Sequence, residues 1–271
     1  MVELPKSSSG RGILEIADSA ARQAGAIIRS HFHGHNQVRV KGKSNLVTQV
    51  DVLAEQVILK ILRAEYPVCA VLSEETNNTS ELSGYTWIVD PLDGTNNFVF
   101  GIPFLCVNIA LAKDADVIFG LTYDPLLDEC FHAQAGSGSF LNGQRIRVSS
   151  RSKLEAAILG FDIGYDVKWG EEVLELARLL RPEVHSIRVM GSAALSLAYI
   201  AGGRLDLYFH KYLYPWDMAP GILLVKEAGG MVSDWDGRMA TPLTRQIVGA
   251  GNELRREFLK WLADCSVKRG R

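Results

Sequence analysis

Five strand-like runs follow one another in the first half of the chain, with turns but no helical segment between them. Their residues are mostly apolar, with frequent β-branched and aromatic side chains. The runs cover residues 70–73, 85–89, 105–112, 117–123 and 129–133. Consecutive strands without intervening helices favour an antiparallel sheet. We therefore predict that the first half of the chain is built on such a sheet.

Two amphipathic helices precede this sheet, and a different pattern follows it. Apolar residues recur with helical period over residues 13–28 and again after Thr48, where Asp51 falls in the first turn of the helix. Beyond about residue 150 helices and strands alternate: helices near 171–180, 192–201, from 216, and at 252–263, and strands near 186–190, 205–209, 231–234 and 246–250. The fold class is thus predicted to be α/β (α+β). An N-terminal unit at residues 1–150 and a C-terminal unit with a mixed sheet at residues 151–271 should enclose a cleft.

Composition limits the classes of function. The chain has 271 residues, of which 47% are hydrophobic, and this is enough for a sizeable core. Its 29 basic and 31 acidic residues give a net charge of -2, so we expect neither nucleic-acid nor membrane binding. The spacing of Cys69, Cys106, Cys130 and Cys265 contains no CxxC pair and favours reduced, buried thiols. With no secretory h-region at the N-terminus, we expect a cytoplasmic protein.

One short segment carries two acids beside a turn. An apolar run from Trp87 stops at Asp90, and Asp93 follows three residues later, just before Gly94. We expect both acids at the end of a buried strand, next to the start of a helix, because glycine allows the chain to turn sharply there. Carboxylate and carbonyl oxygens bind hard divalent ions, and the free N–H groups of a helix start attract phosphate. The segment therefore predicts a site for both a cation and a phosphate.

Further acids stand at the ends of other predicted elements. Glu74 follows the strand at 70–73, Asp51 lies at a helix start, and Asp217 opens the helix that begins near residue 216. For Asp51 and Asp217 a simple role as helix cap is an open alternative. Clustering of Glu74 with Asp90 and Asp93 would be repulsive without a cation, so convergence of these acids predicts a metal site, with Mg²⁺ as the expected ion.

The acids belong to longer ordered motifs. Asp90-Pro-Leu-Asp-Gly-Thr-Asn-Asn-Phe98 fits the pattern Asp-Pro-x-Asp-Gly-Thr-x-Asn-Phe, and Trp216-Asp-Met-Ala-Pro-Gly221 fits Trp-Asp-x-Ala-x-Gly. Shorter matches lie in the same order at 46–51, 73–75, 136–143 and 191–194. Through these motifs the chain resembles the inositol monophosphatase family of Mg²⁺-dependent, lithium-sensitive phosphatases, over about residues 12 to 263.

The resemblance implies a layered αβαβα sandwich and a role for each site residue. One Mg²⁺ would bind Glu74, Asp90 and the Leu92 carbonyl, a second would bind Asp90, Asp93 and Asp217, and Glu74 would share a third. Catalytic roles would fall to Asp51, Thr95 and Glu74, with Thr95 activating a metal-bound water. The implied substrate contacts are Leu92, Asp93, Gly94, Thr95, Gly191, Ser192, Ala193, His210 and Asp217.

Three positions depart from the family pattern. His210 stands where many members have a Glu that contacts the substrate's hydroxyl groups; a histidine there can donate or accept hydrogen bonds or be cationic, or it can simply point to solvent. Pro220 replaces a common alanine, in what we take to be the first helical turn, where proline is tolerated. The family's site lysine could be Lys41 or Lys43.

The leading hypothesis is a phosphomonoesterase that acts on a small polyol phosphate, with myo-inositol monophosphate as the first choice. Histidinol phosphate, fructose 1,6-bisphosphate and 3′-phosphoadenosine nucleotides are alternatives, since related phosphatases share the metal site. A hypothesis of another class is a regulatory protein that keeps this fold to bind a macromolecule. The resemblance also implies a homodimer.

Overall fold

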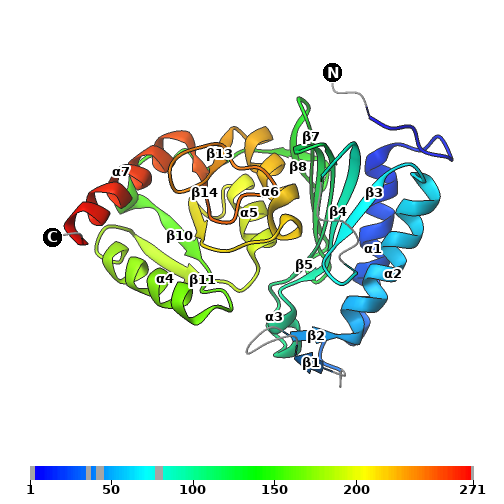
Figure 1. Ribbon diagram of the computed structural model, residues 1–271, viewed down its shortest axis with the longest axis horizontal. Coiled ribbons are helices and arrows are strands. Elements are labelled where there is room, and N and C mark those ends of the chain that lie inside the picture. Colours follow the sequence, from blue (N-terminus) through cyan, green and yellow to red (C-terminus); the bar gives the residue numbers. More distant parts are fainter. Residues whose placement is uncertain (1–3, 35–37, 41–45, 77–81, 270–271) are drawn as a thin grey trace.

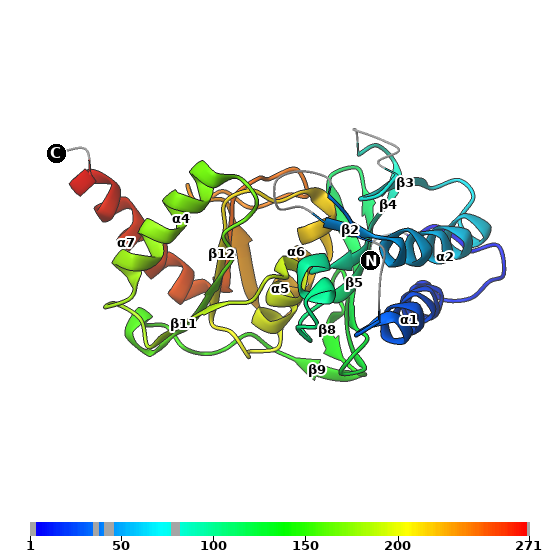
Figure 2. The same cartoon turned by 90° about the horizontal axis from the view of Figure 1, so that it is seen from below.

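The computed structural model describes residues 4–34, 38–40, 46–76 and 82–269, so Lys41 and Lys43 lie outside the described residues. Five layers succeed one another across the molecule (Figure 1). Helices α1 (Ile13–His31) and α2 (Gln49–Glu65) form the first, a seven-stranded sheet the second, and helices α5 (Ala193–Ala201) and α6 (Pro215–Glu227) the third. A five-stranded sheet and the outer helices α4 (Val167–Leu180) and α7 (Asn252–Arg269) complete the stack, as Figure 2 also shows. The predicted αβαβα arrangement is confirmed.

The seven-stranded sheet contains the five predicted strands and two more. Its order follows the sequence: β3 (Ala70–Ser73), β4 (Tyr85–Asp93), β5 (Cys106–Lys113), β6 (Asp116–Asp124), β7 (Glu129–Gln134), β8 (Gly138–Leu141) and β9 (Gln144–Ile146). Six of these strands form antiparallel neighbours, but β3 and β4 are parallel. The prediction of a purely antiparallel sheet is therefore wrong at this edge. The connection from Ser73 to Tyr85 is long enough for a crossover even though its sequence has no helical pattern.

The paired helices cover one face of this sheet because their apolar stripes match it. Ile16, Ala20, Ala24 and Ile28 are fully buried on α1, and a second stripe on α2 runs from Val50 to Leu62. A Cβ on Gly25 would lie 2.6 Å from the Tyr123 ring, so α1 approaches β6 too closely for any side chain there. Fully burying one large apolar side chain contributes roughly 1.5–3 kcal/mol. This face therefore anchors the start of α2, where Asp51 lies.

The second sheet is mixed, as expected, with the order β11-β10-β12-β14-β13. The strands are β10 (Ile158–Phe161), β11 (Ser186–Val189), β12 (Leu207–His210), β13 (Gly230–Ser233) and β14 (Ile247–Gly251). Strand β10 pairs in parallel with both β11 and β12, and the other pairs are antiparallel. The sequence interpretation missed β10. The division of the chain into units at residue 150 stays a prediction.

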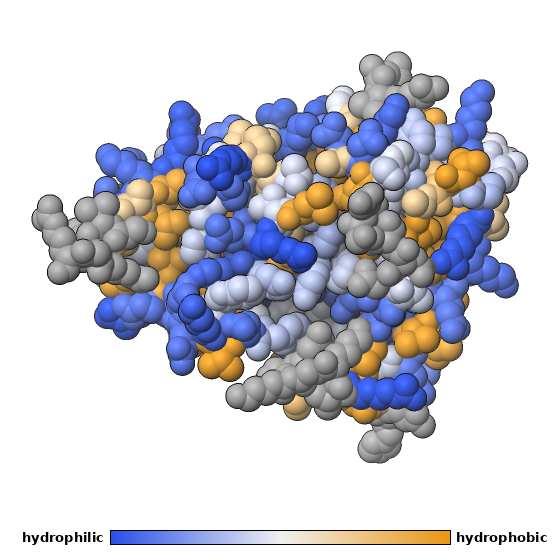
Figure 3. Space-filling model, viewed as in Figure 1, coloured by the Kyte–Doolittle hydropathy of each residue, from blue (hydrophilic) through white to orange (hydrophobic). Residues whose placement is uncertain are grey.

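Further short elements lie between these layers, among them the 3-10 helix Leu154–Ala156. Helix α3 (Thr95–Val99) follows β4 immediately, and the hairpin of β1 (Val38–Val40) and β2 (Leu46–Thr48) leads into α2. Figure 3 shows hydrophilic side chains over most of one face of the molecule, with apolar patches between them. Within the described residues, none of the helices has both the length and the apolar character needed to cross a membrane.

Candidate active site

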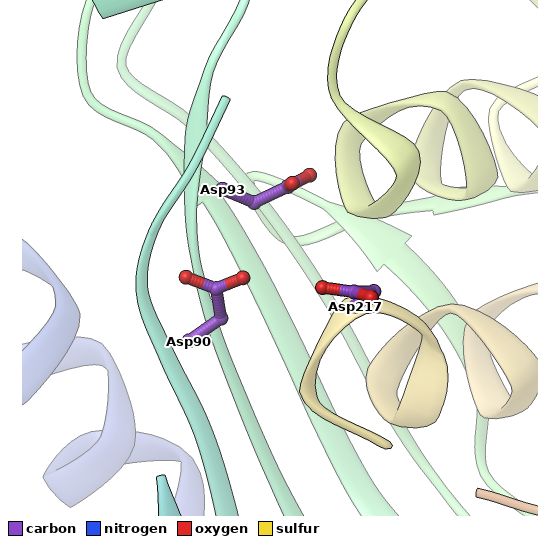
Figure 4. A group of neighbouring side chains, drawn as sticks. All are labelled: Asp90, Asp93 and Asp217. Carbon is purple, nitrogen blue, oxygen red and sulfur yellow. The ribbon is translucent and has the colours of Figure 1, made fainter. Parts of the chain in front are cut away.

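Three carboxylates from distant parts of the sequence converge in one place. One oxygen from each of Asp90, Asp93 and Asp217 lies within 4.8 Å of the others. Figure 4 shows Asp90 and Asp93 approaching from the β4 segment and Asp217 from the start of α6. Glu74, at the end of β3, lines the same pocket. The structure thus brings together the acids that the sequence singled out.

A register shift in β4 puts Asp90 and Asp93 in the same site. Side chains three apart on a regular strand point to opposite faces of the sheet. Strand β4 does not stop at Asp90, as the sequence interpretation expected, but continues to Asp93 with an irregularity between the two acids. Asp90 pairs with Asn108, whereas Asp93 pairs with Cys106. An irregularity of this kind re-aims one side chain, and here it turns both carboxylates to one side.

Asp93 is held from the opposite wall of the pocket. Its Oδ2 accepts hydrogen bonds from the Ser192 hydroxyl at 2.5 Å and from the Ala194 N–H at 2.8 Å. Gly191, whose φ of +82° favours glycine, carries the turn that places these donors. Asp162 accepts from the Gly191 N–H at 2.6 Å and fixes that turn. Ser192 is therefore buried behind the pocket wall and positions Asp93, whereas Gly191 and Ala193 line the pocket itself.

Asp217 is both a helix cap and a member of the cluster. Its Oδ2 accepts from the Tyr214 N–H at 2.6 Å, which satisfies a free donor at the start of α6. Pro220 lies in the second turn of α6 rather than the first, so our placement of it was wrong. A proline there cannot donate to the Trp216 carbonyl, and the buried Asn108 amide donates to that oxygen instead, at 2.7 Å. Asn108 thereby connects the strand of Asp90 with the helix of Asp217.

Thr95 and Asp51 form a second buried pair beside the acids. The Thr95 hydroxyl lies 3.0 Å from Asp51 Oδ1 and 3.0 Å from the Leu92 carbonyl oxygen. Asp51 Oδ2 accepts from both the backbone N–H and the hydroxyl of Thr48, at 2.8 and 2.6 Å. Asp51 therefore caps α2 with one oxygen and orients Thr95 with the other. Gly94, with φ of +92°, makes the turn that starts α3 at Thr95.

Glu55 is a site residue that the sequence interpretation missed. It lies one helical turn after Asp51 and is only 2% exposed. Its carboxylate accepts from the Ser73 hydroxyl and from the N–H groups of Glu75 and Thr76, the last two at 3.2 Å. These contacts hold the segment that carries Glu74. An acid on the apolar side of an otherwise amphipathic helix was the available signal.

The charges in this cluster oppose one another. Burial, followed by the charges of Glu74, Asp93 and Asp217, raises the pKa of Asp90 well above its ordinary value. Burial likewise raises the pKa of Asp217, with Asp93 as the next cause, and it raises the pKa of Asp93 to about 6. Within the described residues, no ion pair reaches these three carboxylates. Such a donor set fits a hard divalent cation, which would neutralise the repulsion.

The carboxylates line a pocket of about 790 Å³. His210 lines this pocket and is only 6% exposed, so the interpretation that it points to solvent is wrong. Burial lowers its pKa to about 4, and the imidazole is therefore neutral rather than cationic at pH 7. The half-exposed Tyr165 lies near the acids: desolvation of its phenol, and then the charges of Asp93 and Glu74, raise its pKa.

Comparison with known proteins assigns the family. The profile of the "Inositol monophosphatase family" matches residues 11–267. The chain belongs to the inositol monophosphatase family. It is 38% identical to inositol monophosphatase 3 of Solanum lycopersicum, over 96% of this chain and 99% of that protein. It is 40% identical to Nus factor SuhB of Escherichia coli K12, over 89% and 91% of the two chains. The Thermotoga maritima IMPase structure has a TM-score of 0.85 at 31% identity and covers 94% of this chain and 98% of its own.

Membership of the inositol monophosphatase family confirms the resemblance inferred from the two motifs and supports a phosphatase activity. The acidic cluster, which offers oxygen ligands alone, could hold the metal ion of this family.

Proposed function

We propose that the protein is a Mg²⁺-dependent phosphomonoesterase that hydrolyses a small polyol phosphate, with myo-inositol monophosphate as the first candidate. The observation that carries this proposal is the convergence of Asp90, Asp93 and Asp217 within 4.8 Å in the lining of one pocket. Glu74, the three aspartates and the Leu92 carbonyl would hold the metal. When bound, Mg²⁺ would supply charge neutralisation for a phosphate and a lowered pKa for water in its coordination shell.

Thr95 and Asp51 would orient the attacking water. A hydroxyl group has one proton to donate and lone pairs to accept. When Thr95 donates to Asp51 Oδ1, at 3.0 Å, its lone pair can accept a hydrogen bond from a water molecule and so direct the water's oxygen towards phosphorus. Burial raises the pKa of Asp51, while its bonds to Thr48 and Thr95 act in the opposite direction. The three hydrogen bonds donated to the Asp51 oxygens, two from Thr48 and one from Thr95, favour the carboxylate form.

The substrate would extend from the carboxylates into the pocket. We propose that phosphate oxygens contact the backbone N–H groups of Gly94 and Thr95, at the start of α3. Gly191, Ala193 and His210 line the other side of the pocket and would face the alcohol part of the substrate. The role of Ser192 would be indirect, through its bond to Asp93.

The test is phosphate release from inositol 1-phosphate as Mg²⁺ is removed with EDTA and then restored. We expect loss and recovery of activity, with inhibition by lithium in the millimolar range. Asp93→Asn keeps the shape but removes the anionic charge of a proposed ligand, and it should weaken Mg²⁺ binding in calorimetry. Activity that persists in excess EDTA would refute the metal mechanism.

A second candidate function is binding of a macromolecular partner. The 40% identity to a protein named Nus factor SuhB supports it. Cells that depend on this protein can distinguish the two functions. Asp93→Asn should abolish catalysis but leave the surface that would bind a macromolecular partner unchanged. Survival of the cellular phenotype with an inactive variant would favour the binding role.

We further propose that the protein works in the cytoplasm as a homodimer. The four free cysteines, of which Cys106 and Cys130 are buried and Cys69 and Cys265 partly exposed, suit a reducing compartment. Light scattering after gel filtration would test the dimer, and a mass of one chain, 29.8 kDa, would refute it.

A further inference from the structure

One backbone turn beside the acidic cluster is held by side chains from both halves of the molecule. Met190 and Gly191 form this turn, between β11 and α5. Asn97, on α3, donates from Nδ2 to the Met190 carbonyl oxygen at 2.8 Å. Asp162, which directly follows β10, accepts from the N–H groups of Met190 and Gly191 at 3.0 and 2.6 Å. Figure 1 shows α3 below the seven-stranded sheet and β10 in the five-stranded sheet, so each half of the molecule holds the turn.

Both holding side chains are themselves fixed by further hydrogen bonds. Asn97 Nδ2 also donates to the Phe104 carbonyl oxygen at 2.7 Å. The hydroxyl of Tyr208, a fully buried residue of β12, donates to Asp162 Oδ2 at 2.8 Å. Asn97 and Asp162 are only 7% and 8% exposed. Buried polar networks whose bonds are satisfied make the surrounding structure rigid.

Gly191 allows Asn97 to approach the turn closely. A Cβ built on Gly191 would lie 2.9 Å from both Nδ2 and Oδ1 of Asn97. The φ of Gly191 is +82°, in the left-handed region that glycine adopts without strain. The amide of Asn97 therefore packs directly against the backbone of the turn, and a displacement of either one moves the other.

The turn leads directly to the groups that hold Asp93. Ser192 and Ala194 follow it, and both donate to Asp93 Oδ2, at 2.5 and 2.8 Å. Asp93 in turn lies four residues before Asn97 in the chain. Covalent bonds thus connect Asp93 to Asn97, a hydrogen bond connects Asn97 to the turn, and the turn leads back to the two donors of Asp93. This closed ring of bonds fixes the direction of one carboxylate in the acidic cluster.

We propose that Asn97 and Asp162 are positioning residues for the metal site. Together they clamp the Met190–Gly191 turn, and through Ser192 and Ala194 this clamp directs the Asp93 carboxylate and sets the affinity for a divalent cation. Neither Asn97 nor Asp162 touches the cation in this scheme. The inference rests on the proposed function, because it concerns the metal ion that this function requires.

Exchanging amide and carboxylate at the two positions separates the clamp from a simple effect of charge. Asn97→Asp removes the donor to both carbonyl oxygens, whereas Asp162→Asn keeps an oxygen that accepts from the turn and an amide that can donate to the Tyr208 hydroxyl. Charge alone would make Asn97→Asp bind a cation more tightly and Asp162→Asn less tightly. The clamp predicts the opposite order: Asn97→Asp should weaken Mg²⁺ binding about tenfold, and Asp162→Asn should stay within about threefold of the wild type.

Calorimetric titration of the metal-free protein with Mg²⁺ measures these affinities. Asn97→Ala and Asp162→Ala should each weaken binding about tenfold, and the Mg²⁺ concentration for half-maximal phosphate release should rise by the same factor. Ser192→Ala removes a direct partner of Asp93 and provides the reference, with a loss of about 10–100-fold.

The matched control is Asn142→Asp. Asn142 Nδ2 also donates to a backbone carbonyl, that of Asp128, but Asn142 does not line the pocket. This variant adds the same charge and removes the same kind of donor, and its Mg²⁺ affinity should equal that of the wild type. Hydrogen exchange in EDTA adds a readout without metal: the amides of Met190 and Gly191 should exchange faster in Asn97→Ala and Asp162→Ala. Urea unfolding checks that each variant folds.

The possible failures are distinguishable. If the wild type neither binds Mg²⁺ nor releases phosphate in its presence, the proposed function fails. If the wild type binds Mg²⁺ but Asn97→Asp binds it equally or more tightly, the function stands and the clamp is overturned. A loss in Asp162→Asn as large as that in Asp162→Ala would also overturn it. If Asn97→Asp does not fold, Asn97→Ala decides, because it removes the donor without adding a charge.

Discussion

Replacing Asn108 with leucine should show how much the hydrogen bond between strand β5 and helix α6 contributes to stability. The Asn108 Nδ2 donates to the Trp216 carbonyl at 2.7 Å, and its Oδ1 accepts from the Thr122 hydroxyl at 2.6 Å. Asn108 and Thr122 are fully buried. Leucine has a similar volume but no polar atom, so both partners would lose their bond. A buried polar group without a partner costs about 1–3 kcal/mol, and with two such groups the expected loss of unfolding free energy is therefore about 2–6 kcal/mol.

Pro220→Ala should recover part of that loss. In a regular helix the N–H of residue 220 donates to the carbonyl of residue 216, and the proline removes this donor. Alanine restores it and gives the Trp216 carbonyl a new partner. In the wild type the same substitution should cost only about 0.4–1 kcal/mol, because Asn108 already occupies the carbonyl and the unfolded chain gains entropy.

The assay is a double-mutant cycle of Asn108→Leu and Pro220→Ala by urea unfolding in EDTA, with m-values compared to check the unfolded state. We expect Pro220→Ala to be neutral or stabilising in the Asn108→Leu background, with a coupling of about 1 kcal/mol or more. Pro103→Ala, an exposed proline outside α6, serves as the control and should be additive. Additivity within about 0.5 kcal/mol for Pro220→Ala would show that the Trp216 carbonyl does not depend on Asn108.

Three further outcomes follow from the site. Thr95→Val should lower kcat by roughly 10²–10⁴-fold, as should Asp51→Asn, whereas Thr95→Ser should retain most activity in the phosphate-release assay. Burial lowers the pKa of His210 from 6.5 to about 4. Between pH 6.5 and pH 4 the His210 imidazole therefore binds a proton in the unfolded chain but not in the folded protein. As the pH falls from 6.5 to 4.5, the wild type should therefore lose about 2 kcal/mol of unfolding free energy relative to His210→Gln. Urea unfolding of both proteins at each pH measures this loss. Glu55→Ala should release the segment of Glu74 and weaken Mg²⁺ binding about 10–100-fold in calorimetry, with no weakening if Glu55 is only a packing residue.

Local patterns predicted most of the elements because periodicity and turn residues are properties of short segments. The helical period of residues 13–28 became α1, and the strand expected at 70–73 became β3 with the same bounds. The strand β10 was missed because Gly160 weakens its strand pattern. The parallel pairing of β3 with β4 was missed because no helical pattern marked the crossover. Strand direction depends on where the chain returns to the sheet, which a local pattern does not contain.

In the candidate active site, too, some residues could be predicted from the sequence and others could not. Asp90, Asp93 and Asp217 could be singled out as potential ligands from their residue type and their position at element ends. The roles of Glu55 and Asn108 could not be assigned, because they arise from partners 14 to 108 positions away in the sequence. For His210, the sequence left open whether the imidazole is charged and where it points. Burial keeps the imidazole neutral, and the hydrogen bond from the Tyr212 N–H orients the ring.

By itself, then, the sequence determined the chemical class of this protein: oxygen ligands for a hard cation, a glycine turn before Thr95, and two motifs that resemble one family of phosphatases. Only the tertiary structure decided which of these groups meet and what surrounds them. The register shift in β4 turns Asp90 and Asp93 to one side, and α6 brings Asp217 to them. The physical reason is that residue type fixes what a side chain can do, whereas its pKa, tautomer and partners depend on groups brought near by packing.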